Sequence, residues 1–158
     1  MKKKILGVFV SLLVVVMLAL SMSTAYAKKP YEVSGTIDSS SELIPPPKLA
    51  GINTFKYYAT TSTWDGDISG DTVGTQTWII HPGNHLNIPD VEIFFEEATV
   101  DGKIGTLTIR MSLVVSMNPD FPSHGNWRII DATGGLEGLH GRGTWGAGWY
   151  EGTIHFDP

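Results

Sequence analysis

The 158-residue chain contains no cysteine. A disulfide framework is therefore impossible, and so is the attachment of a lipid to a cysteine at a cleavage site. Positive charge is also scarce, because eleven Lys and Arg stand against sixteen Asp and Glu, for a formal net charge of −5. This acidic balance argues against nucleic acids and anionic membrane surfaces as partners, since both select basic patches.

Helical periodicity and catalytic motifs are missing as well. No segment after residue 30 repeats its apolar residues about every 3.6 positions over several turns. There is no Gly-x-Ser-x-Gly elbow, and the glycine-rich segments lack the lysine and the strand–helix context of a phosphate loop. The sequence therefore names no catalytic residue, and it predicts no cofactor.

The N-terminus has the pattern of a secretion signal. Lys2–Lys4 form a positive region, Ile5–Leu20 is apolar, and Ala25–Ala27 has the small-x-small pattern of a cleavage site. We expect residues 1–27 to be a signal peptide and the mature protein to be secreted or extracytoplasmic. The alternative is an uncleaved membrane anchor, although the apolar stretch is short for a spanning helix of about 20 residues.

Cleavage would leave one domain with no membrane contact of its own. It would remove three lysines and no acidic residue, which moves the formal net charge from −5 to −8. We expect residues 28–50 to hold a short first strand, Tyr31–Ile37, and a proline-rich connection through Pro45–Pro47. Residues 51–158 should form the main body of the domain, which together with the first strand spans residues 31–158.

Strand signals dominate the main body. The predicted strands are Ile52–Trp64, Ile68–His81, Val91–Ala98, Lys103–Val115 and a pair of glycine-rich closing strands. The alternation is sharpest in Lys103–Val115, where the apolar residues from Leu107 to Val115 share one face. Turn signals at Asp65–Asp67 and Asp101–Gly102 fit antiparallel hairpins. This pattern is typical of an all-β barrel or sandwich.

The last 34 residues contain nine glycines interleaved with large aromatic side chains. Glycine at this density excludes a helix, because each interior glycine costs about 1 kcal/mol relative to alanine. Aromatic residues at this density exclude a flexible linker. We therefore expect bent strands joined by tight turns that close a curved sheet.

Four segments carry a resemblance to a known family. They are Thr63–Gly70, Phe94–Leu113, the Gly-Leu-x-Gly-Leu-x-Gly-x-Gly run at Gly135–Gly143, and Tyr150–Asp157. Together they resemble a family of small microbial domains of unknown function, similar in fold to the allene oxide cyclase and dirigent barrels. The resemblance implies an eight-stranded antiparallel, calycin-like barrel and no activity. No residue matches the cyclase or dirigent active sites, so no catalytic residue is carried over.

Several polar groups imitate functional sites. Asp65–Gly70 begins like a calcium loop but lacks the closing glutamate, so a hairpin turn is the better interpretation. His81 and His85 flank Pro82 and Gly83, which forbid the helix that would align them, and we predict no metal site. Glu96–Glu97 is the only pair of adjacent carboxylate residues in the sequence. Neighbours in a strand face opposite ways, so one of the two could point inward, although solvation of both is favoured.

The five tryptophans can fill a core, line a cavity or form an exposed platform. If a cavity exists, the apolar positions of the middle strands should line it: Tyr58, Trp78, Phe95 and Met111. A barrel of about eight strands has room for packed side chains or one small ligand.

Three functions stay open at this point. The first is non-enzymatic binding of a small apolar or amphipathic molecule in the lumen. The second is a cyclase-like or dirigent-like enzyme, which an inward Glu96 or Glu97 would favour. The third is a surface module for carbohydrate or a partner. Related barrels associate through their outer faces, which leaves a homo-oligomer open.

Overall fold

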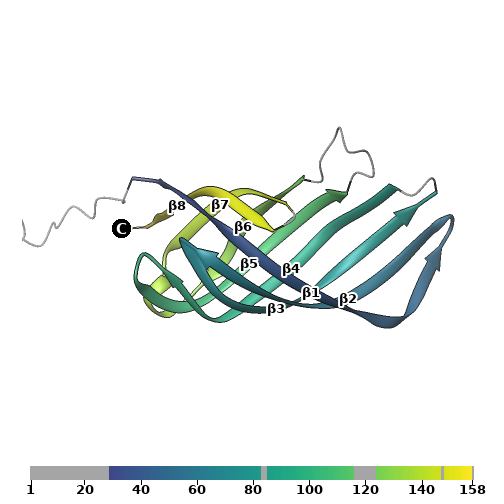
Figure 1. Ribbon diagram of the computed structural model, residues 1–158, viewed down its shortest axis with the longest axis horizontal. Coiled ribbons are helices and arrows are strands. Elements are labelled where there is room, and N and C mark those ends of the chain that lie inside the picture. Colours follow the sequence, from purple (N-terminus) through teal and green to yellow (C-terminus); the bar gives the residue numbers. More distant parts are fainter. Residues whose placement is uncertain (1–28, 83–84, 116–123, 147, 158) are drawn as a thin grey trace, which may run out of the picture.

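The computed structural model describes residues 29–82, 85–115, 124–146 and 148–157. Eight antiparallel strands, each paired with the next along the chain, form one closed barrel, because β8 returns to pair with β1 (Figure 1). The elements are β1 Tyr31–Ala50, β2 Asn53–Gly66, β3 Ile68–His81, β4 His85–Val100, β5 Lys103–Val115, β6 His124–Ala132, the 3-10 helix η1 Gly134–Leu136, β7 Leu139–Gly146 and β8 Trp149–Phe156.

The predicted signal peptide, residues 1–27, lies outside the described residues. In the described part of the chain, no helix has the length and hydropathy needed to cross a membrane. The prediction of an all-β chain with eight antiparallel strands is confirmed.

The barrel is closed at one end only. β1 pairs with β8 through Tyr31–Thr36, and from Ile37 onward β2 is its only strand partner among the described residues. Pairing between β6 and β7 is shorter still, at Gly125–Arg128. In Figure 1, β1 to β4 extend well beyond β7 and β8, whereas β5 and β6 pair as far as Val114 and His124. The molecule is therefore a closed barrel at one end and an open, curved sheet at the other.

Aromatic side chains fill the closed end. Trp64 lies 4.6 Å from Tyr150 and 5.6 Å from Phe95, measured between ring centroids, and Trp127 meets Tyr150 edge to face at 6.5 Å. All four side chains are at most 2% exposed. We call Trp64, Phe95, Trp127 and Tyr150 the plug. Edge-to-face and tilted contacts of this kind add to the hydrophobic stabilisation from burial.

Two glycines make room for Trp127. Gly143 and Gly152 pair with each other across β7 and β8, and Trp127 pairs with Gly143. A Cβ built on Gly152 would lie 2.5 Å from the Trp127 ring, and one built on Gly143 would lie 2.6 Å from the indole nitrogen. The indole N–H instead donates to the backbone oxygens of Thr144 and Glu151 at 3.1 and 3.0 Å. The alternation of glycine and tryptophan thus allows the closing strands to pack against their own core.

Tyr150 connects the last strand to the start of β3. Its hydroxyl donates to the Ile68 carbonyl at 2.8 Å and accepts from the Ile68 N–H at 2.7 Å. Burial raises the pKa of Tyr150 to about 12, against the lowering effect of the hydrogen bond from the Ile68 backbone. The phenol is therefore a neutral structural group that satisfies two buried backbone groups.

The structure corrects the expected connection in residues 38–50. This segment belongs to β1 and pairs with β2, and the register shifts only between Ile44 and Lys48, where the three prolines stand. The composition around Ser39 and Ser41 is typical of a loop. Their hydroxyls nevertheless form hydrogen bonds across the strand pair to the hydroxyls of Ser62 and Thr60, at 3.0 and 2.9 Å. Cross-strand hydroxyl pairs stabilise a sheet that composition alone does not predict.

Two further boundaries differ from the expectation. β4 begins at His85 instead of Val91, because its ladder continues past Pro89 through a register shift between Ile88 and Val91. The glycine-rich end holds three strands, β6 to β8, instead of two. In contrast, β5 matches its predicted bounds, with Leu107, Ile109 and Met111 all at most 4% exposed.

Candidate functional site

The inner face of the open end has one polar wall. It consists of hydroxyl and amide groups on β1, β2 and β3: Ser39, Ser41, Thr60, Ser62 and Gln76. The Gln76 amide nitrogen donates to the Thr60 hydroxyl at 2.6 Å and lies 3.3 Å from the Ser41 hydroxyl. The Gln76 carbonyl oxygen accepts from the Trp78 indole at 2.9 Å. Each group fixes the next, so the wall is a connected and ordered network.

The opposite wall is apolar. Val91 and Ile93 on β4 and Met111 on β5 are at most 4% exposed. Towards the open end, partly buried side chains continue this surface: Trp78, Leu86, Leu113 and Val115. Tyr58 on β2 joins them, because its ring lies 4.5 Å from the ring of Trp78. We call Tyr58, Trp78, Leu86, Leu113 and Val115 the mouth.

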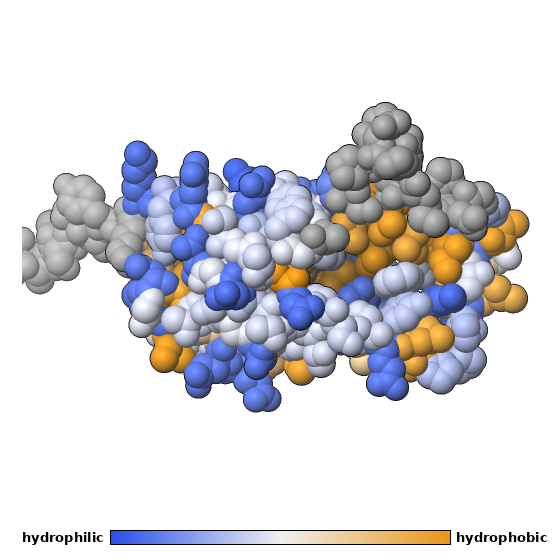
Figure 2. Space-filling view, in the orientation of Figure 1, coloured by the Kyte–Doolittle hydropathy of each residue, from blue (hydrophilic) through white to orange (hydrophobic). Residues whose placement is uncertain are grey.

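Figure 2 shows the apolar character of this end directly. Hydrophobic residues gather in a hollowed region over the part of the molecule where β1 to β4 extend beyond the closed barrel. The rest of the visible face is mostly hydrophilic. An apolar surface that is hollowed and bordered by polar side chains is the usual form of a ligand-binding cleft.

A small hollow lies between the two walls, directly above the plug. Its volume is about 20 Å³, and Ser62, Gln76, Met111 and Trp64 are among the residues that line it. A space of this size holds about one water-sized group. Trp64 is 2% exposed, and its indole N–H has no hydrogen-bond partner among the described residues. A buried donor without an acceptor is costly, so the hollow is a place where an acceptor atom would be stabilised.

The four predicted cavity residues lie on the inner face but do not form one group. Tyr58 and Trp78 contact each other at the mouth. Met111 lines the small hollow, and Phe95 is fully buried against Trp64 in the plug. Gln76 and the hydroxyl wall were not predicted from the sequence. Alternating Ser and Thr residues are typical of the exposed face of a strand, and only the pairing partner shows that they face inward.

Glu96 and Glu97 are both exposed. The residues on either side, Phe95 and Ala98, are both fully buried, and the register shifts between them. A β-bulge at this point inserts an extra residue, so both carboxylates point to solvent instead of to opposite faces. The inward carboxylate that would have favoured an enzyme is therefore absent at this pair.

The remaining sequence motifs are parts of turns and surface pairs. Asp65–Asp67 forms the turn from β2 to β3, as predicted, and the Asp67 carboxylate accepts from the Ser34 N–H at 2.8 Å. His81 shares hydrogen bonds with Asn53 and Asn87 at 3.0 and 3.2 Å. Among the described residues, no three His, Asp or Glu side chains are grouped closely enough to hold a metal ion.

The comparisons with known proteins concern the fold. No family model matches the sequence, and no curated protein matches it either. A solved structure of a protein of unknown function from the DUF3224 family of Shewanella oneidensis MR-1 is similar to this chain, with a TM-score of 0.68. The two sequences are 15% identical, and the match covers 82% of this chain and 99% of the other. The similarity therefore supports an all-β fold shared with a small domain of unknown function.

Proposed function

We propose that this protein is a secreted, non-enzymatic binder of a small, neutral, amphipathic molecule, held at the open end of a calycin-like barrel of the allene oxide cyclase and dirigent kind. One observation carries the proposal. The buried Trp64 N–H has no acceptor, and it belongs to a residue lining a hollow between a hydroxyl wall and an apolar wall. An oxygen of the ligand would occupy this hollow, and its apolar body would lie along the mouth.

The size of the hollow sets the position of the ligand. Because about 20 Å³ admits a single oxygen-sized group, the body of the ligand must lie outside the closed lumen. There it meets Tyr58 and Trp78, whose rings are already in contact. The indole of Trp78 is also fixed by its hydrogen bond to Gln76. Such preorganisation lowers the entropy cost of binding.

The ligand should be neutral. The polar wall consists of hydroxyl and amide groups, and none of the described residues that line the hollow carries a charged side chain. An ion placed there would lose its hydration without an opposite charge, which is far more costly than burying a hydroxyl or carbonyl group. A secreted carrier of this kind also agrees with the signal pattern of residues 1–27.

The test uses 1-octanol, a neutral chain with one oxygen, and the neutral fluorophore N-phenyl-1-naphthylamine. We expect the fluorophore to bind the mature protein and 1-octanol to displace it. Trp78→Ala should weaken the binding of the fluorophore and of 1-octanol at least tenfold, equivalent to about 1.4 kcal/mol. The matched control is Trp149→Ala, because Trp149 is 40% exposed on β8 and Tyr150 beside it points inward. Equal losses in the two variants, or no displacement by 1-octanol, would contradict the proposal.

A further inference from the structure

The three arginines of the chain stand in one row. Arg110, Arg128 and Arg142 are the only arginines in the sequence. Arg110 pairs with Arg128 across β5 and β6, and Arg128 pairs with Arg142 across β6 and β7. Met111, which follows Arg110, and Trp127, which precedes Arg128, are both buried, so the arginines occupy the outer face of the sheet. We call these three residues the arginine row.

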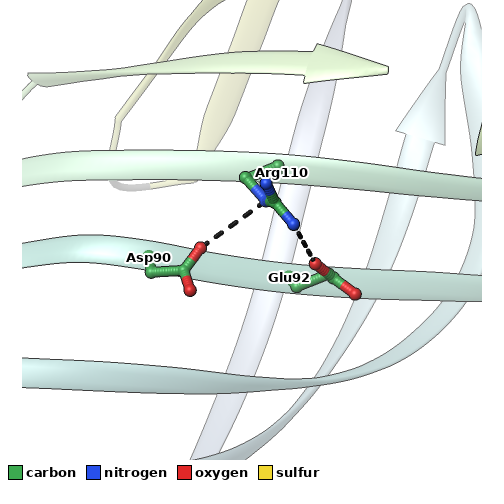
Figure 3. Close-up of polar contacts among 3 residues, drawn as sticks. All are labelled: Asp90, Glu92 and Arg110. Atoms are coloured by element: carbon green, nitrogen blue, oxygen red, sulfur yellow. Dashed lines mark hydrogen bonds and ion pairs between the residues drawn. The ribbon is translucent and has the colours of Figure 1, made fainter. Parts of the chain in front are cut away.

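Only one end of the row is neutralised. Arg110 donates to Glu92 at 2.8 Å and lies 3.6 Å from Asp90, as Figure 3 shows. The hydrogen bond to Glu92 raises the pKa of the Arg110 guanidinium above its ordinary value. Within the described residues, Arg128 and Arg142 have no carboxylate partner. Like charges placed directly opposite each other in a sheet are destabilising, so this pair needs a counter-charge from elsewhere.

The arginine row borders a groove. A hollow of about 630 Å³ lies on the outer face of β5 to β8, and all three arginines line it. In the next row of outward residues, Ser112, Asn126 and Thr144 pair in register and also line the groove. Ser112 and Asn126 supply further donors, whereas the Thr144 hydroxyl already donates to the Glu151 carboxylate at 3.3 Å. This volume is within the range of small-molecule sites.

The floor of the groove between these two rows of side chains is backbone. It includes Gly143 and Gly152, which both line the groove. Positions 143 and 152 face the core, where Trp127 lies against them. Because successive strand residues face opposite sides, these positions carry no side chain on the outer face.

We propose that this groove binds a small multivalent oxyanion of the diphosphate class. Neighbouring strands are about 4.8 Å apart, so the row spans about 10 Å, enough for two linked phosphoryl groups. The guanidinium group is suited to phosphate, because its donors form two parallel hydrogen bonds to one oxyanion. The site is distinct from the mouth, since it uses outward residues of β5 to β8 and the mouth uses inward residues of β2 to β5.

The test measures binding of inorganic pyrophosphate by isothermal titration calorimetry at low salt. Orthophosphate, which has one phosphoryl group instead of two, is the comparison. We expect saturable 1:1 binding of pyrophosphate and at least tenfold weaker binding of orthophosphate. Arg128→Gln/Arg142→Gln should reduce pyrophosphate affinity at least tenfold, and Arg128→Lys should retain more of it than Arg128→Gln. Lys48→Gln and Lys56→Gln, combined, remove the same charge from another part of the molecule and should change the affinity less than twofold.

A thermal readout separates a specific site from general charge. Pyrophosphate should raise the melting temperature of the wild-type protein and of the lysine control, and it should leave the double arginine variant unchanged. Without pyrophosphate, the double arginine variant should melt at or above the wild-type temperature, because two like charges have been removed. The proposal is overturned if pyrophosphate does not bind the wild-type protein, or if the lysine control loses as much affinity as the arginine variant.

Discussion

Replacing Tyr150 with phenylalanine tests how the barrel is closed. The substitution removes one oxygen from a side chain that is 1% exposed and leaves the ring in its place in the plug. The Ile68 N–H then loses the acceptor 2.7 Å away, and the Ile68 carbonyl loses the donor 2.8 Å away. Ile68 is fully buried, so water cannot replace these bonds without entering the core.

The expected loss follows from the two orphaned groups. A buried backbone group without its partner costs about 1–3 kcal/mol, so with two such groups Tyr150→Phe should lower the free energy of unfolding by about 2–6 kcal/mol. Domains of this size have a total stability of roughly 5–15 kcal/mol and lose about 3–5 °C in melting temperature per kcal/mol. The variant should therefore melt about 6–30 °C lower.

Urea unfolding followed by tryptophan fluorescence measures this difference. The matched control is Tyr57→Phe, because Tyr57 lies on the outer face of β2 and contacts Lys48 through its ring, which phenylalanine retains. The control should stay within about 0.5 kcal/mol of the wild-type protein. If Tyr150→Phe is as stable as Tyr57→Phe, the hydrogen bonds between Tyr150 on β8 and Ile68 on β3 do not stabilise the closed end.

Two further predictions concern the same closed end. Gly143→Ala should lower the free energy of unfolding by about 1–3 kcal/mol through overpacking, because the new Cβ would meet the Glu151 backbone oxygen and lie 2.6 Å from the Trp127 indole nitrogen. Thr144→Ala on the outer face should cost less, and urea unfolding compares the two variants. Stability should also fall between pH 10 and pH 12, because the unfolded tyrosine releases its proton near 10.0 while burial raises the pKa of folded Tyr150 to about 12. Below pH 10 both states keep the proton and this contribution is constant, so the wild-type protein should lose more stability than Tyr150→Phe as the pH rises from 10 to 12 in unfolding curves.

The strand order and the inner face of β5 could be predicted because their signals are local. The apolar residues of Leu107–Val115 alternate without interruption, and the Asp101–Gly102 turn fixes where the strand begins. The extent of β1 could not be predicted, because Ser39 and Ser41 have the composition of a loop. Only their pairing with Ser62 and Thr60 makes them part of a strand.

The exposure of Glu96 and Glu97 and the position of the arginine row both depend on strand register, which the sequence does not display. Glu96 and Glu97 both face solvent because a bulge interrupts the alternation, and a bulge is set by the partner strand. The arginine row has the same origin. Arg110, Arg128 and Arg142 are 18 and 14 positions apart in the sequence, and a shift of one residue in either pairing would place one of them on the inner face.

The proposed ligand is neutral and amphipathic and binds at the mouth with its oxygen beside Trp64. Titration of the ¹⁵N-labelled mature protein with 1-octanol tests this through the five indole N–H resonances. We predict that the Trp64 and Trp78 signals shift together and saturate, while Trp149 on the outside and Trp127, which is bonded to two backbone oxygens, stay in place. Saturable shifts at Trp149 alone, or no shift at Trp64 and Trp78 at the solubility limit of 1-octanol, would contradict the account.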